Sequence, residues 1–393
     1  MSETNILRIE STPKRLIYSL SVCLFFIFIL FALLMPNDTF NIKKIAFSIL
    51  FIINIFSIIG EMSTSKYYAV SFHMVIFPIL LLLFSLLAGG SLYSTVSNIY
   101  VCFYAGLILI AVKRKNNFEN LLLFALKIIA IIIIFSAILD FAGYLDIYNN
   151  KLLMNLSLSQ DAMIGKSASY WSYYVIFLKA SPLLLILLGY ALKNKKFVLV
   201  VFTFTAMFLS GTRANYFAAI IIILFYIFST NNKYLKIASI IVGLFILVIF
   251  FSKFIEYFKT MFISKQVSDN NRIQDYKSII SLFQNHPLTL FIGTGFGDTA
   301  AIANYGFTTG TSELSYLDLL RKMGILGLIP FMYFILKPIK TLIQNSETKL
   351  LVVTYIIYLM VAATNPLLFS STAYIYYVYI YIKYYQFKIN NTL

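Results

Sequence analysis

Arg213 stands in a tight hairpin between two strongly apolar runs of the sequence. The segment Ser210-Gly211-Thr212-Arg213 ends the first run, and the second begins at once with Ala214. If the two runs cross a membrane, placing a guanidinium among lipid costs about 2.5 to 3.5 kcal/mol. We therefore expect Arg213 to face a wet or anionic cavity. Lys179, about two turns inside another apolar run, has two interpretations: it faces such a cavity, or its long stem carries the charge to the membrane surface.

A second set of candidates lies in the polar stretch 252–314. Arg272 belongs to a segment whose spacing predicts a short amphipathic helix ending at Asn285. Glycine permits tight turns or a close approach of backbone to a ligand, and three glycines follow: Gly293, Gly295 and Gly297. They lack the preceding strand and following helix of a dinucleotide fingerprint. The glycines predict either simple turns or a backbone that contacts substrate.

Helical spacing distinguishes two carboxylates at the end of this stretch. Asp318 can pair with Arg321 or Lys322 in the next turn, whereas Glu313 has no local partner. A carboxylate near arginines can take a proton from a hydroxyl group as a general base. Alternatively, Glu313 is a solvated residue at a helix N-terminus, where the helix dipole stabilises negative charge.

The composition places all of these residues in a membrane protein. Of the 393 residues, 60% are apolar or aromatic and 12% are charged, whereas a soluble domain has about a quarter charged residues. Runs such as 16–35 and 121–139 reach the roughly 20 residues that cross a hydrocarbon layer as a helix. The fold class is therefore an all-α polytopic membrane protein, and soluble enzymes and nucleic-acid-binding proteins are excluded.

Hydropathy predicts about twelve membrane-spanning helices in one membrane domain of residues 1–393. The net charge of +16 is concentrated at every second span boundary, which the positive-inside rule assigns to the cytoplasm. Both termini are then cytoplasmic, the first span is retained, and two large loops lie outside, at 142–170 and 252–314. The expected spans are approximately 16–35, 45–60, 68–88, 95–112, 121–141, 171–192, 197–211, 214–229, 234–251, 315–336, 350–368 and 373–387.

Other chemistries find no support in the residue pattern. Cys23 and Cys102 lie inside apolar runs, where cysteine usually serves as a small hydrophobe. His73 is best interpreted as a buried imidazole and His286 as a loop residue, and no cluster has metal-ligand spacing. The sequence predicts no metal, no cofactor and no nucleic-acid partner.

Three short pieces, in this order, make the chain resemble the O-antigen ligase and O-antigen polymerase family of bacterial envelope glycosyltransferases. They are the Ser-Gly-Thr-Arg hairpin at Arg213, the Arg272 helix leading to the three glycines, and the helix from Tyr316 to Gly327. Together they cover residues about 197–336, and the first half of the chain resembles the family in hydropathy alone. The resemblance implies transfer of glycan from an undecaprenyl-diphosphate carrier outside the cytoplasmic membrane, without nucleotide sugar or metal.

The same resemblance implies a role for each candidate. Arg213 and Arg272 would hold the diphosphate bidentately and stabilise charge on the leaving group, which a metal ion would otherwise do. Glu313 would be the base. The remaining substrate contacts would come from Lys179, Gly293, Gly295, Gly297, Tyr316 and Arg321.

The implied partners are the undecaprenyl-diphosphate-linked oligosaccharide, the lipid bilayer and a chain-length regulator protein. The implied location is the bacterial inner membrane, with the active site facing the periplasm.

One position distinguishes the two branches of the family. Ligases carry a histidine three residues before the tyrosine of the Tyr-Leu helix, and this chain has Glu313 there. The resemblance therefore favours the polymerase, which joins a growing carrier-linked polymer to the non-reducing end of a new carrier-linked repeat unit. Two alternatives stay open: a ligase that moves the glycan to lipid A core, and a lipid-linked oligosaccharide flippase or other transporter.

Overall fold

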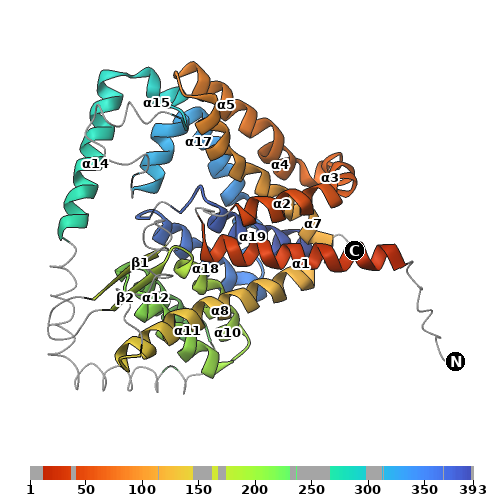
Figure 1. The fold of residues 1–393 in the computed structure, drawn as a ribbon, viewed down its shortest axis with the longest axis vertical. Helices are drawn as coiled ribbons and strands as arrows, with labels where there is room; N and C mark the ends of the chain where they lie inside the picture. Colours follow the sequence, from red (N-terminus) through yellow and green to blue (C-terminus); the bar gives the residue numbers. More distant parts are fainter. Residues whose placement is uncertain are drawn as a thin grey trace.

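The computed structural model describes residues 12–36, 41–113, 115–144, 162–166, 174–230, 236, 266–297, 312, 314–365 and 367–390. Within these ranges the chain is helical apart from one two-stranded hairpin (Figure 1). Five of the described helical segments are long and apolar enough to cross a membrane, and a bent pair makes a sixth. These features confirm the all-α, multi-pass membrane class. The number of twelve spans and the two large outer loops stay predictions.

The first half of the chain supplies most of the long apolar segments. Residues 65–87 and 92–112 each form one segment from several consecutive helical pieces. The helices described there are α1 (Thr12–Leu34), α2 (Ile42–Ile53), α3 (Ile55–Met62), η1 (Ser65–Tyr67), α4 (Tyr68–Ser71), the π-helical η2 (Phe72–Ile76), α5 (Phe77–Leu87), α6 (Leu92–Ile99), η3 (Tyr100–Ala105), α7 (Gly106–Lys113) and α8 (Lys115–Phe141).

The second half contains the hairpin, three shorter apolar helices and the long helix α17. Nearly all of the span expected at 234–251 lies outside the described residues. The described elements are β1 (Ala162–Lys166), β2 (Tyr174–Leu178), η4 (Ser181–Leu183), α10 (Leu184–Lys193), α11 (Phe197–Leu209), α12 (Arg213–Ser229), α14 (Gln266–Asn285), α15 (Leu288–Ile292), α17 (Ser315–Leu342), α18 (Ser346–Ala362) and α19 (Ser371–Asn390).

The span expected at 45–60 is a bent pair of helices. α2 and α3 meet at Asn54 with an angle of 70°. The buried side chain of Asn54 donates a hydrogen bond to the carbonyl of Leu50 at 2.8 Å. Because short polar side chains compete for backbone groups, asparagine inside a helix favours such a break.

The span expected at 171–192 is wrong in its first part. Residues 174–178 form β2, which pairs antiparallel with β1 so that Ala162 lies opposite Leu178. Helical structure begins only at Ser181, with Pro182 in its first turn, where the missing N–H of proline costs no helical hydrogen bond. Val175, Ile176 and Phe177 also suit a strand. Lys179 therefore lies in the turn between β2 and η4, not two turns inside a helix.

α19 forms the centre of the helix bundle. Every residue from Ala373 to Ile382 is at most 4% exposed. Pro338 in α17 lacks the N–H that would bond the carbonyl of Phe334 within the helix, and the hydroxyl of Tyr381 donates to that carbonyl at 2.8 Å. Because lipid offers no water to satisfy such a carbonyl, the hydroxyl of Tyr381 supplies the hydrogen-bond donor that the proline lacks.

Polar contacts join several helix ends on the side expected to face the cytoplasm. Glu119 at the start of α8 accepts from Lys383 of α19 at 2.6 Å, and a small cavity beside this pair is also lined by Lys193 and Glu347. All four residues belong to boundaries expected on the cytoplasmic side. In Figure 1 the end of α19 lies on the right, and α14 and the hairpin lie on the opposite side.

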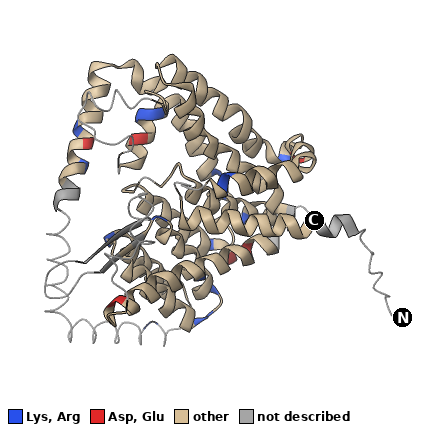
Figure 2. Ribbon diagram, in the orientation of Figure 1, with Lys and Arg blue, Asp and Glu red and all other residues tan. Residues whose placement is uncertain are grey.

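The other set of helix ends is joined by a different group of contacts. Lys43, at the start of α2, donates to Ser371 at the start of α19 at 3.0 Å. Ser85 in α5 accepts from the backbone N–H of Phe296 at 3.1 Å. These boundaries are the ones expected outside the membrane. Figure 2 shows few charged residues along the described apolar helices, and in α17 residues of opposite sign lie close together.

Candidate functional site

A glycine loop, residues 293–297, follows α15 and contacts α17 at the end of the bundle expected to face outwards. The backbone N–H of Thr294 donates to the carbonyl of Arg321 at 2.7 Å, and that of Gly295 donates to the carbonyl of Lys322 at 2.9 Å. The two carbonyls are available because α17 is kinked at Gly324 (φ 62°, ψ −179°). The N–H groups of the loop therefore donate to the two carbonyls in place of the N–H groups of the next helical turn.

Glycine is required on both sides of this contact. Gly293 has φ 79° and Gly324 has φ 62°, a region that side chains rarely adopt. A Cβ at Gly293 would overlap the carbonyl of Lys322, and a Cβ at Gly324 would overlap the carbonyl of Phe291. The two segments can approach so closely only without side chains.

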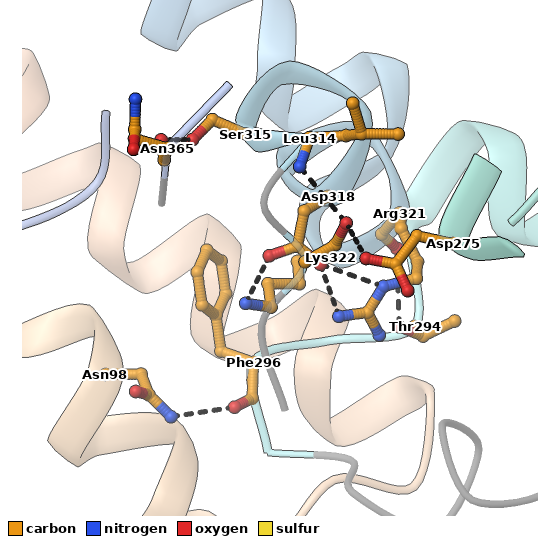
Figure 3. A network of polar contacts seen from close by, with 11 residues as sticks. Asn98, Asp275, Thr294, Phe296, Leu314, Ser315, Asp318, Arg321, Lys322 and Asn365 are labelled. Atoms are coloured by element: carbon orange, nitrogen blue, oxygen red, sulfur yellow. Dashed lines mark hydrogen bonds and ion pairs between the residues drawn. The ribbon is translucent and has the colours of Figure 1, made fainter. Parts of the chain in front are cut away.

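The rest of the loop packs against α5 and α6. A Cβ at Gly295 would lie 2.7 Å from the Cα of Ser85, and a Cβ at Gly297 would lie 2.6 Å from the hydroxyl of Thr95. Asn98 of α6 donates to the carbonyl of Phe296 at 2.8 Å (Figure 3). The close approach that these glycines allow is thus to protein atoms, as in the turn interpretation. Contact of Gly293, Gly295 and Gly297 with substrate stays a prediction.

A buried ion cluster lies in α17 just before the kink. The carboxylate of Asp318, 4% exposed, accepts from Arg321 Nε at 3.0 Å and Nη2 at 2.5 Å, and from Lys322 Nζ at 2.6 Å (Figure 3). The pairing expected from helical spacing is confirmed. Arg321 is 3% exposed, and its Nε and Nη2 both bond the same oxygen, Asp318 Oδ1, which holds the guanidinium in one orientation. Its predicted contact with substrate stays a prediction.

One face of α14 turns toward α17. Arg272, Asp275, Ile279 and Leu282 follow one another at intervals of three or four residues, so they share a face. Ile279 and Leu282 are buried, and Asp275 accepts a hydrogen bond from the hydroxyl of Ser312 at 2.6 Å. The helix predicted around Arg272 is confirmed, and it ends at Asn285 as expected.

The hydrogen bond between Asp275 and Ser312 joins α14, the helix that carries Arg272, to the residue before the expected base. Ser312 is 2% exposed and also accepts from the backbone N–H of Leu314 at 3.1 Å, which fixes the chain on both sides of residue 313. Glu313 itself lies outside the described residues. The helix that carries Arg272 is therefore bonded directly beside Glu313, although the two are far apart in sequence.

The start of α17 is anchored to α18. The backbone N–H of Ser315 donates to the carbonyl of Ala363 at 3.2 Å, and its hydroxyl donates to the carbonyl of Asn365. The hydroxyl of Tyr316 donates to the carbonyl of Leu359 at 3.1 Å. The side chain of Tyr316 is thus engaged within the protein, and its role in substrate binding stays a prediction.

The Arg213 hairpin is tied to the turn that contains Lys179. Asn215, fully buried in the first turn of α12, donates to the hydroxyl of Ser181 at 2.8 Å and to that of Ser210 at 2.9 Å. Ser181 is two residues after Lys179, and Asn215 is two residues after Arg213. The structure therefore brings the segments of these two predicted cations together. Both side chains are partly exposed.

The predicted site residues thus form two groups, and α18 supports both. One group surrounds Arg272 and Arg321, and the other contains Arg213 and Lys179. α12, which starts at Arg213, packs on α18, and the start of α17 bonds to the end of α18. A shared site of Arg213 and Arg272 stays a prediction.

Sequence reasoning missed three residues that position the site: Asp275, Ser312 and Asn215. The signal for Asp275 was present, because it follows Arg272 by three residues on one helical face. Ser312 and Asn215 gave no signal, since both act through partners distant in sequence.

Thr212, in the turn before α12, allows a test of the hydrogen bonding around Arg213. In the described part of the chain its hydroxyl oxygen is buried and has no hydrogen-bond partner. Because a valine keeps the shape and removes an unsatisfied polar group, Thr212→Val should leave thermal stability unchanged or raise it by up to about 1 kcal/mol. Thermal unfolding of the purified protein in detergent measures this.

The matched control is Thr203→Val in the preceding helix. The buried Thr203 hydroxyl donates to the carbonyl of Leu199 at 2.7 Å, so its removal should cost stability, by about 0.5 to 1.5 kcal/mol. A larger loss for Thr212→Val than for Thr203→Val would show that the Thr212 hydroxyl has a stabilising partner.

Comparison with known families gives a match in the middle of the chain. Residues 198–332 match the family model described as O-antigen ligase, about a third of the chain. No curated protein matches the chain in a direct sequence comparison. The matched segment runs from α11 into α17 and includes Arg213, Arg272 and Arg321. This match supports the resemblance of the chain to the O-antigen ligase and polymerase family, whose members are glycosyltransferase-like membrane enzymes.

Proposed function

We propose that this protein is an O-antigen polymerase. It transfers the glycan chain from undecaprenyl diphosphate to the non-reducing end of a new lipid-linked repeat unit, at the periplasmic face of the bacterial inner membrane. The observation that carries the proposal is the family match, which includes Arg213 and Arg272, together with the hydrogen bond between Asp275 and Ser312. That bond holds the Arg272 helix beside residue 313.

The proposed reaction needs no metal ion. A hydroxyl of the acceptor repeat unit attacks the anomeric carbon of the donor glycan, and the bond from that carbon to the diphosphate oxygen breaks. Arg213 and Arg272 bind the diphosphate and stabilise the charge that develops on it as it leaves. Glu313 takes the proton of the attacking hydroxyl. We expect turnover to be unchanged when a chelator removes divalent cations.

Glu313 also supports the polymerase over the ligase, by resemblance. The family's ligases have histidine at this position, and the chain has glutamate. The ligase remains the second candidate, because the matching family model is described as O-antigen ligase. We further propose a chain-length regulator protein as a partner of the polymerase.

The lipopolysaccharide of cells that lack the protein distinguishes these functions. Loss of a polymerase leaves lipid A core capped with a single repeat unit. Loss of a ligase leaves the core bare and the glycan on its carrier. A normal ladder of chain lengths in such cells would contradict both assignments.

Replacing Glu313 by glutamine is expected to slow polymerisation by about a hundredfold at neutral pH. The amide keeps the size of the side chain and cannot accept the proton. The measurement is turnover of a purified lipid-linked repeat unit by the variant in detergent. Glu347→Gln, at the exposed start of α18 near the other end of the bundle, is the control and should turn over normally. Normal turnover of Glu313→Gln would reduce Glu313 to a helix cap.

A further inference from the structure

A groove of about 490 Å³ lies between α1 and α8, away from the candidate functional site. Its α1 side is a stripe of residues spaced by about one helical turn, from Tyr18 and Ser19 through Val22 to Phe26. Asn117 of α8 bonds the hydroxyl of Tyr18 at one end of the groove. The groove therefore runs along the two helices from their end near Glu119 toward the middle of the bundle.

The lining of the groove changes in polarity along its length. At the end near the start of α8, the lining includes the hydroxyls of Tyr18 and Ser19 and the amides of Asn117 and Asn120. Further along α1 the lining is apolar, with Val22 and Phe26. A polar end and an apolar continuation correspond to the headgroup region and the acyl chain of a phospholipid.

The sequence places four basic residues at the helix ends next to the polar end of the groove. Lys14 and Arg15 belong to the first turn of α1 and precede Tyr18 by four and three residues in the sequence. Lys113 ends α7 and Lys115 begins α8. Clusters of lysine and arginine at the ends of membrane helices attract anionic lipid headgroups.

The nearest acidic side chain of α8 does not offset these charges. Glu119 accepts from Lys383 at 2.6 Å and from the hydroxyl of Tyr379 at 3.3 Å, both in α19. Its carboxylate is thus occupied by another helix. The polar end of the groove offers donors suited to a phosphate, the amides and hydroxyls of its lining, and the sequence adds positive charge at the adjoining helix ends.

We propose that the groove between α1 and α8 is a binding site for a phospholipid with an anionic headgroup. The phosphate lies among Tyr18, Asn117 and Asn120, and one acyl chain follows α1 past Val22 to Phe26. The site goes beyond the proposed transferase function and does not depend on it.

The reactivity of a native cysteine can report on occupancy of the groove. Cys23 lines the groove and is exposed, whereas Cys102 is fully buried. N-ethylmaleimide should therefore modify the native protein in detergent at Cys23. Phosphatidylglycerol should slow this modification at least tenfold, and phosphatidylcholine at the same mole fraction should leave it nearly unchanged.

Two double variants separate a specific site from general attraction to charge. Lys14→Gln with Arg15→Gln should lose the protection by phosphatidylglycerol. Lys193→Gln with Lys196→Gln removes the same charge from exposed lysines at the turn between α10 and α11, and should keep it. Gel filtration checks that each variant is folded.

A second measurement does not rely on thiol reactivity. Phosphatidylglycerol with a photoactivatable acyl chain should cross-link to peptides of α1 and α8, and Val22→Trp, which fills the groove, should abolish this cross-link. Equal protection by both lipids, or equal loss in both double variants, would overturn the proposal. Protection that needs no lipid and grows with protein concentration would assign the groove to a second copy of the chain instead.

Discussion

Replacing Arg272 by alanine is expected to abolish long polysaccharide chains while the amount of protein in the membrane stays normal. Arg272 lies on the face of α14 that packs toward α17, one turn from the bond between Asp275 and Ser312. Without its guanidinium, the diphosphate loses a bidentate donor and the leaving group loses charge stabilisation. The measurement is the ladder of chain lengths on a gel of lipopolysaccharide from complemented cells.

Two further variants at α14 sharpen this test. Arg272→Lys keeps the charge but loses the planar fork, so it should restore only short chains. Lys277→Ala removes a cation from the exposed side of the same helix and should leave the ladder unchanged. An unchanged ladder in Arg272→Ala would eliminate the phosphate role of Arg272.

Replacing Asp318 by alanine is expected to cause the largest loss of folding stability among these variants. The substitution leaves Arg321 and Lys322, with side chains 3% and 12% exposed, without the carboxylate that binds both. Removing one partner from a buried ion pair typically costs about 3 to 5 kcal/mol. Yield in the membrane and thermal unfolding in detergent both report the loss.

The ion pair between Glu119 and Lys383 provides the control for Asp318. Its side chains are 22% and 21% exposed, so Glu119→Ala should cost about 1 kcal/mol or less. Replacing Asp318, Arg321 and Lys322 together by leucine should recover part of the stability, because apolar side chains need no partner. Equal losses for Asp318→Ala and Glu119→Ala would show that the cluster in α17 is not a buried structural element.

Much of the fold was predictable because it follows from local chemistry. Continuous apolar runs of sufficient length identified the long helices. α8 ends at Phe141 and α17 begins at Ser315 as expected, although α8 begins earlier, at Lys115, and α17 continues to Leu342. The end of α14 at Asn285 follows from the proline two residues later. The pairing of Asp318 with Arg321 and Lys322 follows from helical spacing alone.

The features that could not be predicted depend on context that hydropathy does not report. An apolar run such as 174–178 suits a buried strand or a buried helix, and only its pairing with β1 decides between them. The bend at Asn54 depends on one side-chain hydrogen bond inside an otherwise uniform apolar segment.

The candidate site shows the same division between local and distant chemistry. The glycines were identified as positions of tight turns or close approach, but the atoms that they approach come from α5, α6 and α17. The bond between Asp275 and Ser312 joins residues 37 positions apart. The residue types were therefore visible in the sequence, and their neighbours were not.

The tyrosines of α19 also bear on how the protein is assembled in the cell. This helix contains seven tyrosines, and it is not among the described helices that are apolar enough by composition to cross a membrane. Two of its buried hydroxyls bond to α17 and α18, through Phe334 and Thr354. We therefore expect α19 to stay at the translocon until α17 and α18 have entered the bilayer. α19 then inserts by packing against these two helices. Ribosome-stalled chains that end beyond α19, probed by cross-linking to the translocon, would reveal this order of membrane insertion.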